Sequence, residues 1–302
     1  MNFEDKPISF APKPLIENKD KIDYLLMKVK YLKRIQPKMA DFEDIYKKEE
    51  IEKDKQIIKE YQSKWATEKD AYQKFRQNKS EIYEAAVIDI LNENGIFGKD
   101  SEVIFASRYD DIFSGIDGAL VKKGEDGDSE YLGLNMDVTF SSTDMTLEQK
   151  FESIKQCIRV GILPTLKYFQ DPKTKEHKSI SLPKIIIGSS EASADGLIQL
   201  WGETNEDKRE ALKNHPIQSQ VIMEGLDQLI YFYNFAKNLF NNAEESGNIE
   251  MTEKYQNICY KYGQMYNEFH RIYMSKKDLI ESHYGGISED PVYKKLKSLT
   301  RG

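Results

Sequence analysis

Two apolar stretches of the chain, residues 115–121 and 131–140, each carry one aspartate at a position where a buried strand would have an aliphatic side chain. The aspartates are Asp117 and Asp137. The segment between the stretches, KKGEDGDSE, is polar and rich in turn residues, so we expect the stretches to form consecutive antiparallel strands. A buried carboxylate is costly unless it is paired or binds a metal ion. The two stretches therefore predict a pair of strands that carries a functional site.

The elements predicted around this pair are both helices and strands. A helix is expected from Ser80, its N-cap, to Gly95, with an apolar stripe that includes Tyr83 and Val87. The continuous apolar run LPKIIIGSS is typical of a strand buried on both faces. The remaining predicted elements are strands at 102–107 and 114–123 and helices at about 146–160 and 192–202. This order predicts an α/β (α+β) fold in which a mixed sheet is flanked by helices.

Helices are expected on both sides of this core. The N-terminal segment 1–79 is dense in Lys and Glu and has widely spaced apolar positions, which predicts a charged helical arm. The C-terminal segment 203–302 has apolar residues at spacings of three and four over two long runs, at about 217–242 and 249–283, which predicts an antiparallel helical hairpin. We therefore expect three parts: the arm, an α/β core at 80–202, and the hairpin.

The composition is typical of a soluble globular protein, and a cytoplasmic location is expected by default because no signal peptide or membrane span is recognised. The net charge is −7, and the acidity lies in residues 81–215, which have 15 Lys and Arg against 25 Asp and Glu. A cation-binding site requires such acidity, although acidic surface loops contribute to it. The two cysteines fall in predicted helices, and no segment has the pattern of a signal peptide or a membrane span, so we expect reduced thiols and no membrane partner. The sequence is also compatible with a homodimer that forms through the arm or the hairpin.

The order helix, antiparallel strands, helix, strand resembles that of the PD-(D/E)xK nuclease superfamily over residues 80–202. Asp117, in SGIDGAL, matches the first acid of the family motif, and Asp137, in NMDVTF, matches the second acid on the next strand. Glu84 matches the acid that the family often has on the preceding helix, with Glu81 as the alternative. The resemblance implies a restriction-endonuclease-like core.

The chain departs from this motif at the lysine. The position two residues beyond Asp137 is Thr139, which points to the same face of the strand and cannot supply a positive charge. Some members of the superfamily place the lysine on the following helix, where Lys150 and Lys155 both flank the apolar stripe. We prefer Lys155 as the catalytic lysine because it lies between two core-facing positions, and the choice between the two stays open.

The resemblance implies an enzyme that hydrolyses phosphodiester bonds in DNA or RNA with Mg²⁺ or Mn²⁺. Asp117, Asp137 and Glu84 would bind the metal ion, which stabilises charge on the phosphate and lowers the pKa of a bound water. The lysine would orient that water and stabilise the transition state. Two other interpretations stay open: an interaction or structural protein built on a degenerate nuclease-like fold, and aspartates that only form turns or ion pairs. No P-loop or dinucleotide-binding motif indicates another cofactor.

Overall fold

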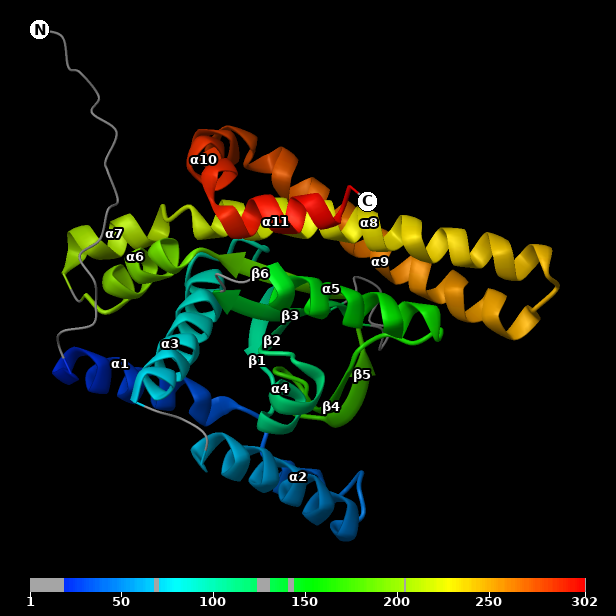
Figure 1. Ribbon diagram of the computed structural model, residues 1–302, viewed down its shortest axis with the longest axis horizontal. Helices are drawn as coiled ribbons and strands as arrows, with labels where there is room; N and C mark the ends of the chain where they lie inside the picture. The colour runs from blue at the N-terminus through cyan, green and yellow to red at the C-terminus, as the bar shows by residue number, and fades with distance from the viewer. Residues whose placement is uncertain (1–18, 68–70, 124–130, 141–143, 204, 302) are drawn as a thin grey trace, which may run out of the picture.

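A four-stranded mixed sheet lies at the centre of the molecule (Figure 1). The computed structural model describes residues 19–67, 71–123, 131–140, 144–203 and 205–301, so most of the predicted polar connector, at 124–130, lies outside the described residues. The strand order is β1-β2-β3-β6. The antiparallel neighbours are β1 (Ser101–Phe105), β2 (Gly118–Lys123) and β3 (Tyr131–Phe140), and β6 (Lys184–Ser189) runs parallel to β3. The predicted fold class, a mixed sheet flanked by helices, is confirmed.

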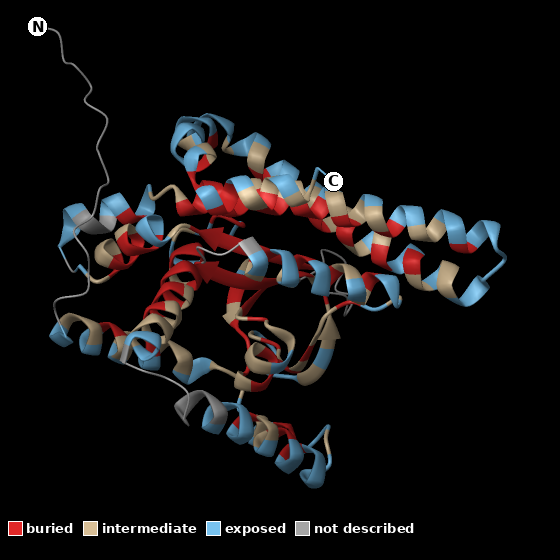
Figure 2. Cartoon of the chain, in the orientation of Figure 1, coloured by how far each residue is buried: buried red, intermediate tan, exposed pale blue. Residues whose placement is uncertain are grey.

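The core of the protein lies between this sheet and the helices that cover it, and the strands β2, β3 and β6 are almost entirely buried (Figure 2). All six residues of β6 are buried, as the continuous apolar run predicts. The covering helices include α3 (Ala71–Glu93), α5 (Asp144–Arg159) and α8 (Ile217–Glu245). The predicted stripe of α3 is confirmed, because Tyr83 and Val87 are fully buried.

The predicted start of the first core helix, at Ser80, is wrong. It falls inside α3, which begins nine residues earlier than expected, and Ser80 is not an N-cap but donates a hydrogen bond to Glu84 one turn later. The extension is stabilised by tertiary contacts, because the buried Lys79 forms ion pairs with Glu191 and Asp195 of α6 (Glu191–Trp201). A serine inside a helix satisfies its hydroxyl locally, so its sequence signal resembles that of a cap.

The rest of the charged arm comprises α1 (Lys19–Leu32), the 3-10 helices η2 (Lys33–Ile35) and η3 (Met39–Phe42), and α2 (Lys48–Thr67). A buried apolar cluster docks η3 and α2 on the core. Phe42 packs edge-on against Tyr168 of β4 (Thr165–Gln170), the strand that pairs with β5 (His177–Ser181) in a two-stranded ribbon. The buried carboxylate of Asp54 accepts hydrogen bonds of 2.6 Å from Lys167 Nζ and from the Tyr168 hydroxyl. The arm is therefore held by buried polar contacts as well as by apolar ones.

The C-terminal hairpin consists of α8 and α9 (Ile249–Ser275), which run side by side and project beyond the sheet (Figure 1). The predicted second helix is too long, because it ends at Ser275 and two shorter helices follow, α10 (Lys277–Glu289) and α11 (Pro291–Leu299). A further short helix, α7 (Glu206–Lys213), precedes α8. Among the described helices, none combines the length and the apolar character that crossing a membrane requires.

Side-chain amides close the middle of both edges of the sheet. At the β6 edge, Gln228 of α8 accepts a hydrogen bond from the backbone N–H of Ile186 and donates one to its carbonyl oxygen, at 2.9 and 2.7 Å. At the β1 edge, Asn92 of α3 does the same with the N–H and carbonyl of Val103, at 2.7 and 2.6 Å. Each amide thus offers the donor and acceptor that a neighbouring strand would offer.

The hairpin helices approach closely at Gly225, which gives a test of the packing. A Cβ atom placed on Gly225 would lie 2.3 Å from the Phe269 ring. We expect Gly225→Ala to lower the free energy of unfolding by about 1–3 kcal/mol, because the added methyl group overfills a packed contact. Chemical denaturation measures this change.

The matched control is Gly196→Ala in α6, where nothing lies within 4 Å of the added Cβ atom. That substitution is expected to stabilise the protein by up to about 1 kcal/mol, because alanine favours a helix over glycine. Equal effects of the two substitutions would contradict the close approach of α8 and α9.

Candidate active site

The two aspartates lie beside each other, Asp137 on β3 and Asp117 immediately before β2. Asp117 directly precedes β2, and its backbone N–H donates to the carbonyl of Met136 on β3 at 2.9 Å. The carboxylate of Asp117 turns back onto β3 and accepts a hydrogen bond of 2.7 Å from the N–H of Val138. Asp137 is the residue between these two β3 partners. The antiparallel pairing therefore brings the two predicted acids to one place, as the sequence predicts.

Asp137 is buried and forms ion pairs with two lysines. Its Oδ1 atom lies 2.5 Å from Nζ of Lys150, and its Oδ2 atom lies 3.0 Å from Nζ of Lys184. Burial alone would raise the pKa of Asp137, but the positive charges of Lys184 and Lys150 outweigh it and hold this pKa below its usual value. Asp137 is therefore a carboxylate at neutral pH.

Of the two candidate lysines, the structure brings Lys150 to the acids and not Lys155. Both lie on α5, but five residues separate them, which turns their side chains toward different neighbours. Lys155 forms an ion pair with Glu152 at 3.2 Å and lies 5.3 Å above the ring of Phe235 on α8. The reason for preferring Lys155, its place between two core-facing positions, instead directs it toward the hairpin.

Asp117 stands in a different electrostatic environment from Asp137. Burial, together with the negative charges of Asp111 and Asp137, raises the pKa of Asp117 to about 7, and the nearby Lys150 opposes this rise. Among the hydrogen bonds of the described residues, Asp117 has the Val138 N–H as its partner, on Oδ2. The two aspartates thus have pKa values shifted in opposite directions, a pattern that is common at functional sites.

Glu84 faces the same group of acids from α3. Burial and the negative charges of Asp117 and Asp111 raise its pKa well above the usual value, while Lys33 of η2 lowers it. Its Oε1 atom accepts a hydrogen bond of 2.9 Å from Ser80. The alternative acid, Glu81, accepts a hydrogen bond from Gln77 and raises the pKa of Asp111 through its charge. Glu84 is the helix acid on which the negative charge of Asp117 acts.

Sequence reasoning missed three charged residues near these acids: Asp111, Lys184 and Lys33. Asp111 lies on α4 (Arg108–Ser114), a helix that the sequence analysis did not predict, and forms a 2.6 Å ion pair with Arg108. The signal for α4 is present, since Ser107 caps its first turn and Gly115 ends it in the left-handed conformation. Lys184 could also have been identified from the sequence, because a lysine at the start of an otherwise apolar strand requires an acidic partner.

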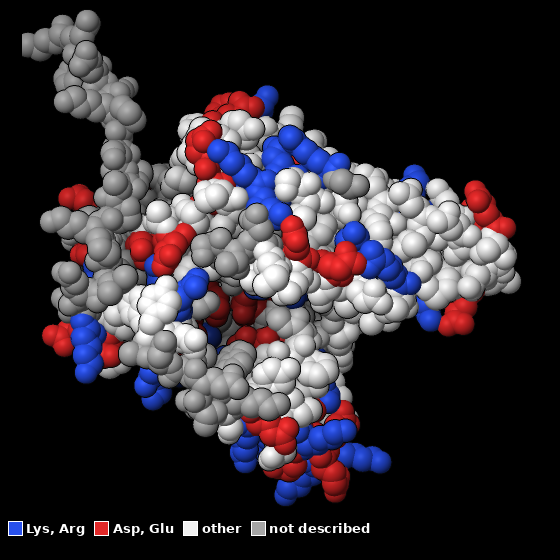
Figure 3. Space-filling view, in the orientation of Figure 1, with Lys and Arg blue, Asp and Glu red and all other residues white. Residues whose placement is uncertain are grey.

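The chemistry of these side chains suits a hard divalent cation. In the space-filling view a hollow opens between α3, α4 and α5, and acidic side chains lie at its base (Figure 3). Within the described ranges, no three His, Cys, Asp or Glu side chains are arranged to hold a metal ion by themselves. Mg²⁺ usually keeps several waters and binds one or two carboxylates together with substrate phosphates. The pair Asp117 and Asp137 fits that mode of binding better than an all-protein cage.

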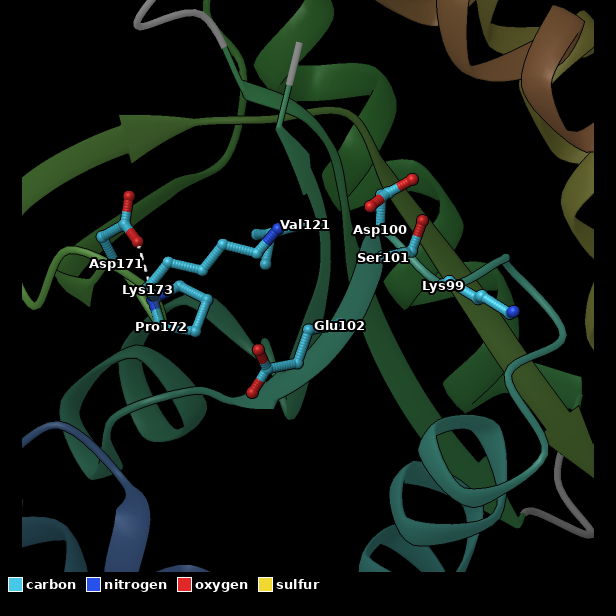
Figure 4. A pocket seen from close by; sticks show the side chains of 8 residues that line it. All are labelled: Lys99, Asp100, Ser101, Glu102, Val121, Asp171, Pro172 and Lys173. Carbon is cyan, nitrogen blue, oxygen red and sulfur yellow. Dashed lines mark hydrogen bonds between the residues drawn. The ribbon is translucent and has the colours of Figure 1, made fainter. Parts of the chain in front are cut away.

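Two cavities lie away from these residues. One, of about 70 Å³, has Glu102, Asp171 and Lys173 in its wall, where Asp171 accepts a hydrogen bond of 2.7 Å from the backbone N–H of Lys173 (Figure 4). The other, of about 220 Å³, lies between α6, α8 and α10 and is lined by Ser193, His215 and other residues. Neither cavity is lined by a candidate site residue.

No family model matches this chain, and neither a curated protein nor a solved structure matches it.

Proposed function

We propose that the chain is a divergent member of the PD-(D/E)xK superfamily and hydrolyses phosphodiester bonds in DNA or RNA with Mg²⁺ or Mn²⁺. The observation that carries the proposal is the meeting of three elements of that motif. Asp117 and Asp137 lie side by side on antiparallel strands, and Lys150 reaches Asp137 from the following helix. Lys150 thus contacts the second acid and would act as the displaced lysine, because Thr139 occupies the usual position.

In this proposal the residues of the site have separate tasks. Asp117 and Asp137 would hold the metal ion, and the Glu84 carboxyl group would lie beside it. When bound, the ion supplies positive charge to the phosphate and lowers the pKa of a coordinated water. The ammonium group of Lys150, whose side chain is 28 % exposed, donates hydrogen bonds to that water or to a phosphate oxygen. Its exposure leaves room for such an approach.

The direct test is a cleavage screen with single-stranded and double-stranded DNA and RNA. Wild-type protein is expected to cleave at least one of these substrates with Mg²⁺ or Mn²⁺ and to stop when EDTA is added. The Asp137→Ala variant, purified in the same way, is expected to be inactive. Equal cleavage by both proteins would assign the activity to another site or to a contaminant.

The two α5 lysines give a second test within the same helix. We expect Lys150→Met to lower kcat by about 100-fold to 1,000-fold, because it removes a donor to the developing charge. Lys155→Met is the matched control and should leave kcat unchanged, because Lys155 contacts Glu152 and Phe235. Steady-state kinetics of the substrate found in the screen measures both. A larger loss for Lys155→Met would reverse the assignment.

One observation favours a second candidate function, a non-catalytic interaction protein on a degenerate nuclease-like fold. Both oxygens of Asp137 already have a lysine partner, so the acid is neutralised without a metal ion. In that case, neither Mg²⁺ nor Mn²⁺ would bind to the wild-type protein in calorimetry, and no substrate would be cleaved. Metal binding that is lost in Asp137→Ala would exclude this candidate.

A further inference from the structure

Lys184 is a buried lysine at the first position of β6. It is 6 % exposed, and it pairs with Asn135 across the parallel β3–β6 ladder. A lysine loses much of its hydration in such a place, and burial is tolerated only when acceptors surround the ammonium group. The partners of its Nζ atom therefore indicate why a lysine occupies this position.

The Nζ atom of Lys184 joins two parts of the candidate site. It lies 3.0 Å from Oδ2 of Asp137 and donates a hydrogen bond of 3.0 Å to the carbonyl oxygen of Ser114. Ser114 is the last residue of α4, the helix that carries Asp111. One ammonium group thus connects the carboxylate on β3 to the carbonyl end of α4, where a positive charge is favoured.

The backbone at Gly115 leaves space for this contact. Gly115 has a φ of 58°, and a Cβ atom there would lie 3.2 Å from Nζ of Lys184 and 3.4 Å from Oδ2 of Asp137. Glycine meets both requirements, since it adopts the left-handed conformation without strain and has no side chain to crowd the ion pair. The local sequence SGID is thus compatible with a lysine held between α4 and β3.

Lys184 and Lys150 differ in how they are held. The Lys184 side chain is 7 % exposed and has two acceptors, whereas the Lys150 side chain is 28 % exposed and reaches Asp137 from α5. A group as enclosed as Lys184 is positioned to hold other residues rather than to meet a substrate. This division between a fixed and an accessible lysine was not expected from the family motif, which has a single lysine.

We propose that Lys184 is a positioning residue, which fixes the Asp137 carboxylate and the end of α4 so that Asp137 meets the metal ion and the substrate in one orientation. The inference rests on the proposed function and deepens it. Loss of such a supporting contact typically lowers activity or metal affinity by about 10-fold to 100-fold. Lys184 itself does not touch the reacting atoms.

The kinetic test compares Lys184→Met with Lys122→Met. Lys122 lies on β2 of the same sheet and forms an ion pair with Glu268 at 2.8 Å, away from the acids. Well below the melting temperature, Lys184→Met is expected to lower kcat by about 10-fold to 100-fold with KM unchanged, whereas Lys122→Met keeps the wild-type kcat. A purely structural role would lower the melting temperature of both variants and leave both kcat values unchanged.

Lys184→Arg covers the case in which the methionine variant does not fold. It keeps the positive charge beside Asp137, but the planar guanidinium group cannot reproduce both contacts of the ammonium group. We expect it to keep most of the stability and to lose kcat. Wild-type kcat in Lys184→Arg, or in Lys184→Met, would overturn the proposal.

A double-mutant cycle in EDTA separates this inference from the proposed function. Asp137→Leu, Lys184→Met and the double variant are unfolded with urea. If Lys184 holds Asp137, the double variant is expected to be less destabilised than the two single effects predict, by about 10-fold in the unfolding equilibrium constant. Additive effects would overturn the inference. A wild-type protein that cleaves nothing would instead refute the proposed function, and the cycle would still decide whether the contact exists.

Discussion

Asp137→Ala is expected to abolish metal-dependent cleavage and to lower the free energy of unfolding by about 3–5 kcal/mol, because it leaves a buried lysine without its acid. The buried lysine is Lys184, and Lys150 loses the same partner. If Asp137 binds the metal ion as proposed, its loss removes several kcal/mol of transition-state stabilisation, so kcat should fall by about 1,000-fold or more. Urea denaturation measures the first effect, and the cleavage assay measures the second.

The matched control for this variant is Asp54→Ala. Asp54 is also a buried carboxylate bound to a lysine, Lys167, but it lies on α2 and docks the arm. We expect it to lose a similar amount of stability and to keep kcat. Cleavage lost equally in both variants would indicate that activity reports only on folding, and the assignment of Asp137 would fail.

Asp117→Asn is expected to stabilise the metal-free protein at pH 8 and to have little effect at pH 4. Burial and the nearby negative charges raise the pKa of Asp117 from 3.8 to about 7, so the folded chain binds this proton more tightly than the unfolded chain does. Stability therefore falls as the pH rises from about 4 to about 7 and stays low above that. A shift of about three pH units corresponds to roughly 4 kcal/mol, which is the upper bound of the gain. Asparagine does not titrate and still accepts the hydrogen bond from Val138.

The measurement is urea denaturation in EDTA from pH 4 to pH 8. Asp171→Asn is the control with the opposite sign. Burial would raise the pKa of Asp171, but hydrogen bonds from the backbone N–H groups of Thr174 and Lys173 outweigh it and lower this pKa. The asparagine variant at 171 should therefore lose stability above pH 4. If Asp117→Asn raised the free energy of unfolding by the same amount at every pH, the pKa of Asp117 would not be raised to about 7.

The strands that carry the two acids could be predicted from the sequence because their signals are local. Apolar runs bounded by turn residues gave β2, β3 and β6, and a connector of nine residues fits a hairpin better than a crossover. An acid within each run then indicated the site, since the pairing of neighbouring strands brings the acids together. Asp117 and Asp137 follow from this local information, whereas Glu84 was assigned by the family resemblance.

The rest of the candidate site depends on long-range contacts that the sequence does not encode in one place. Lys184 is 47 residues from Asp137, and its role follows only from the parallel pairing of β6 with β3. Asp110 and Asp111 are neighbours in sequence, yet α4 directs Asp110 to the backbone of β4 and leaves Asp111 near Asp117. Spacing alone likewise could not separate Lys150 from Lys155, because the partners that decide between them lie on β3 and α8.

The predicted start of α3 and the predicted end of α9 were wrong for a related reason. α3 extends through Ser80 because Lys79 finds acidic partners on α6, and the break at Ser275 has no glycine or proline to mark it. The end of a helix is decided there by tertiary packing rather than by local propensity.

The amides of Asn92 and Gln228 also determine how this protein can meet other chains. Open sheet edges are the usual places for an extended peptide or a second subunit to add a strand. Here the middle of both edges is already bound by helices of the same chain, at Val103 and Ile186. Strand addition would have to break these internal hydrogen bonds. A strand could therefore be added to the four-stranded sheet only by displacing Asn92 or Gln228.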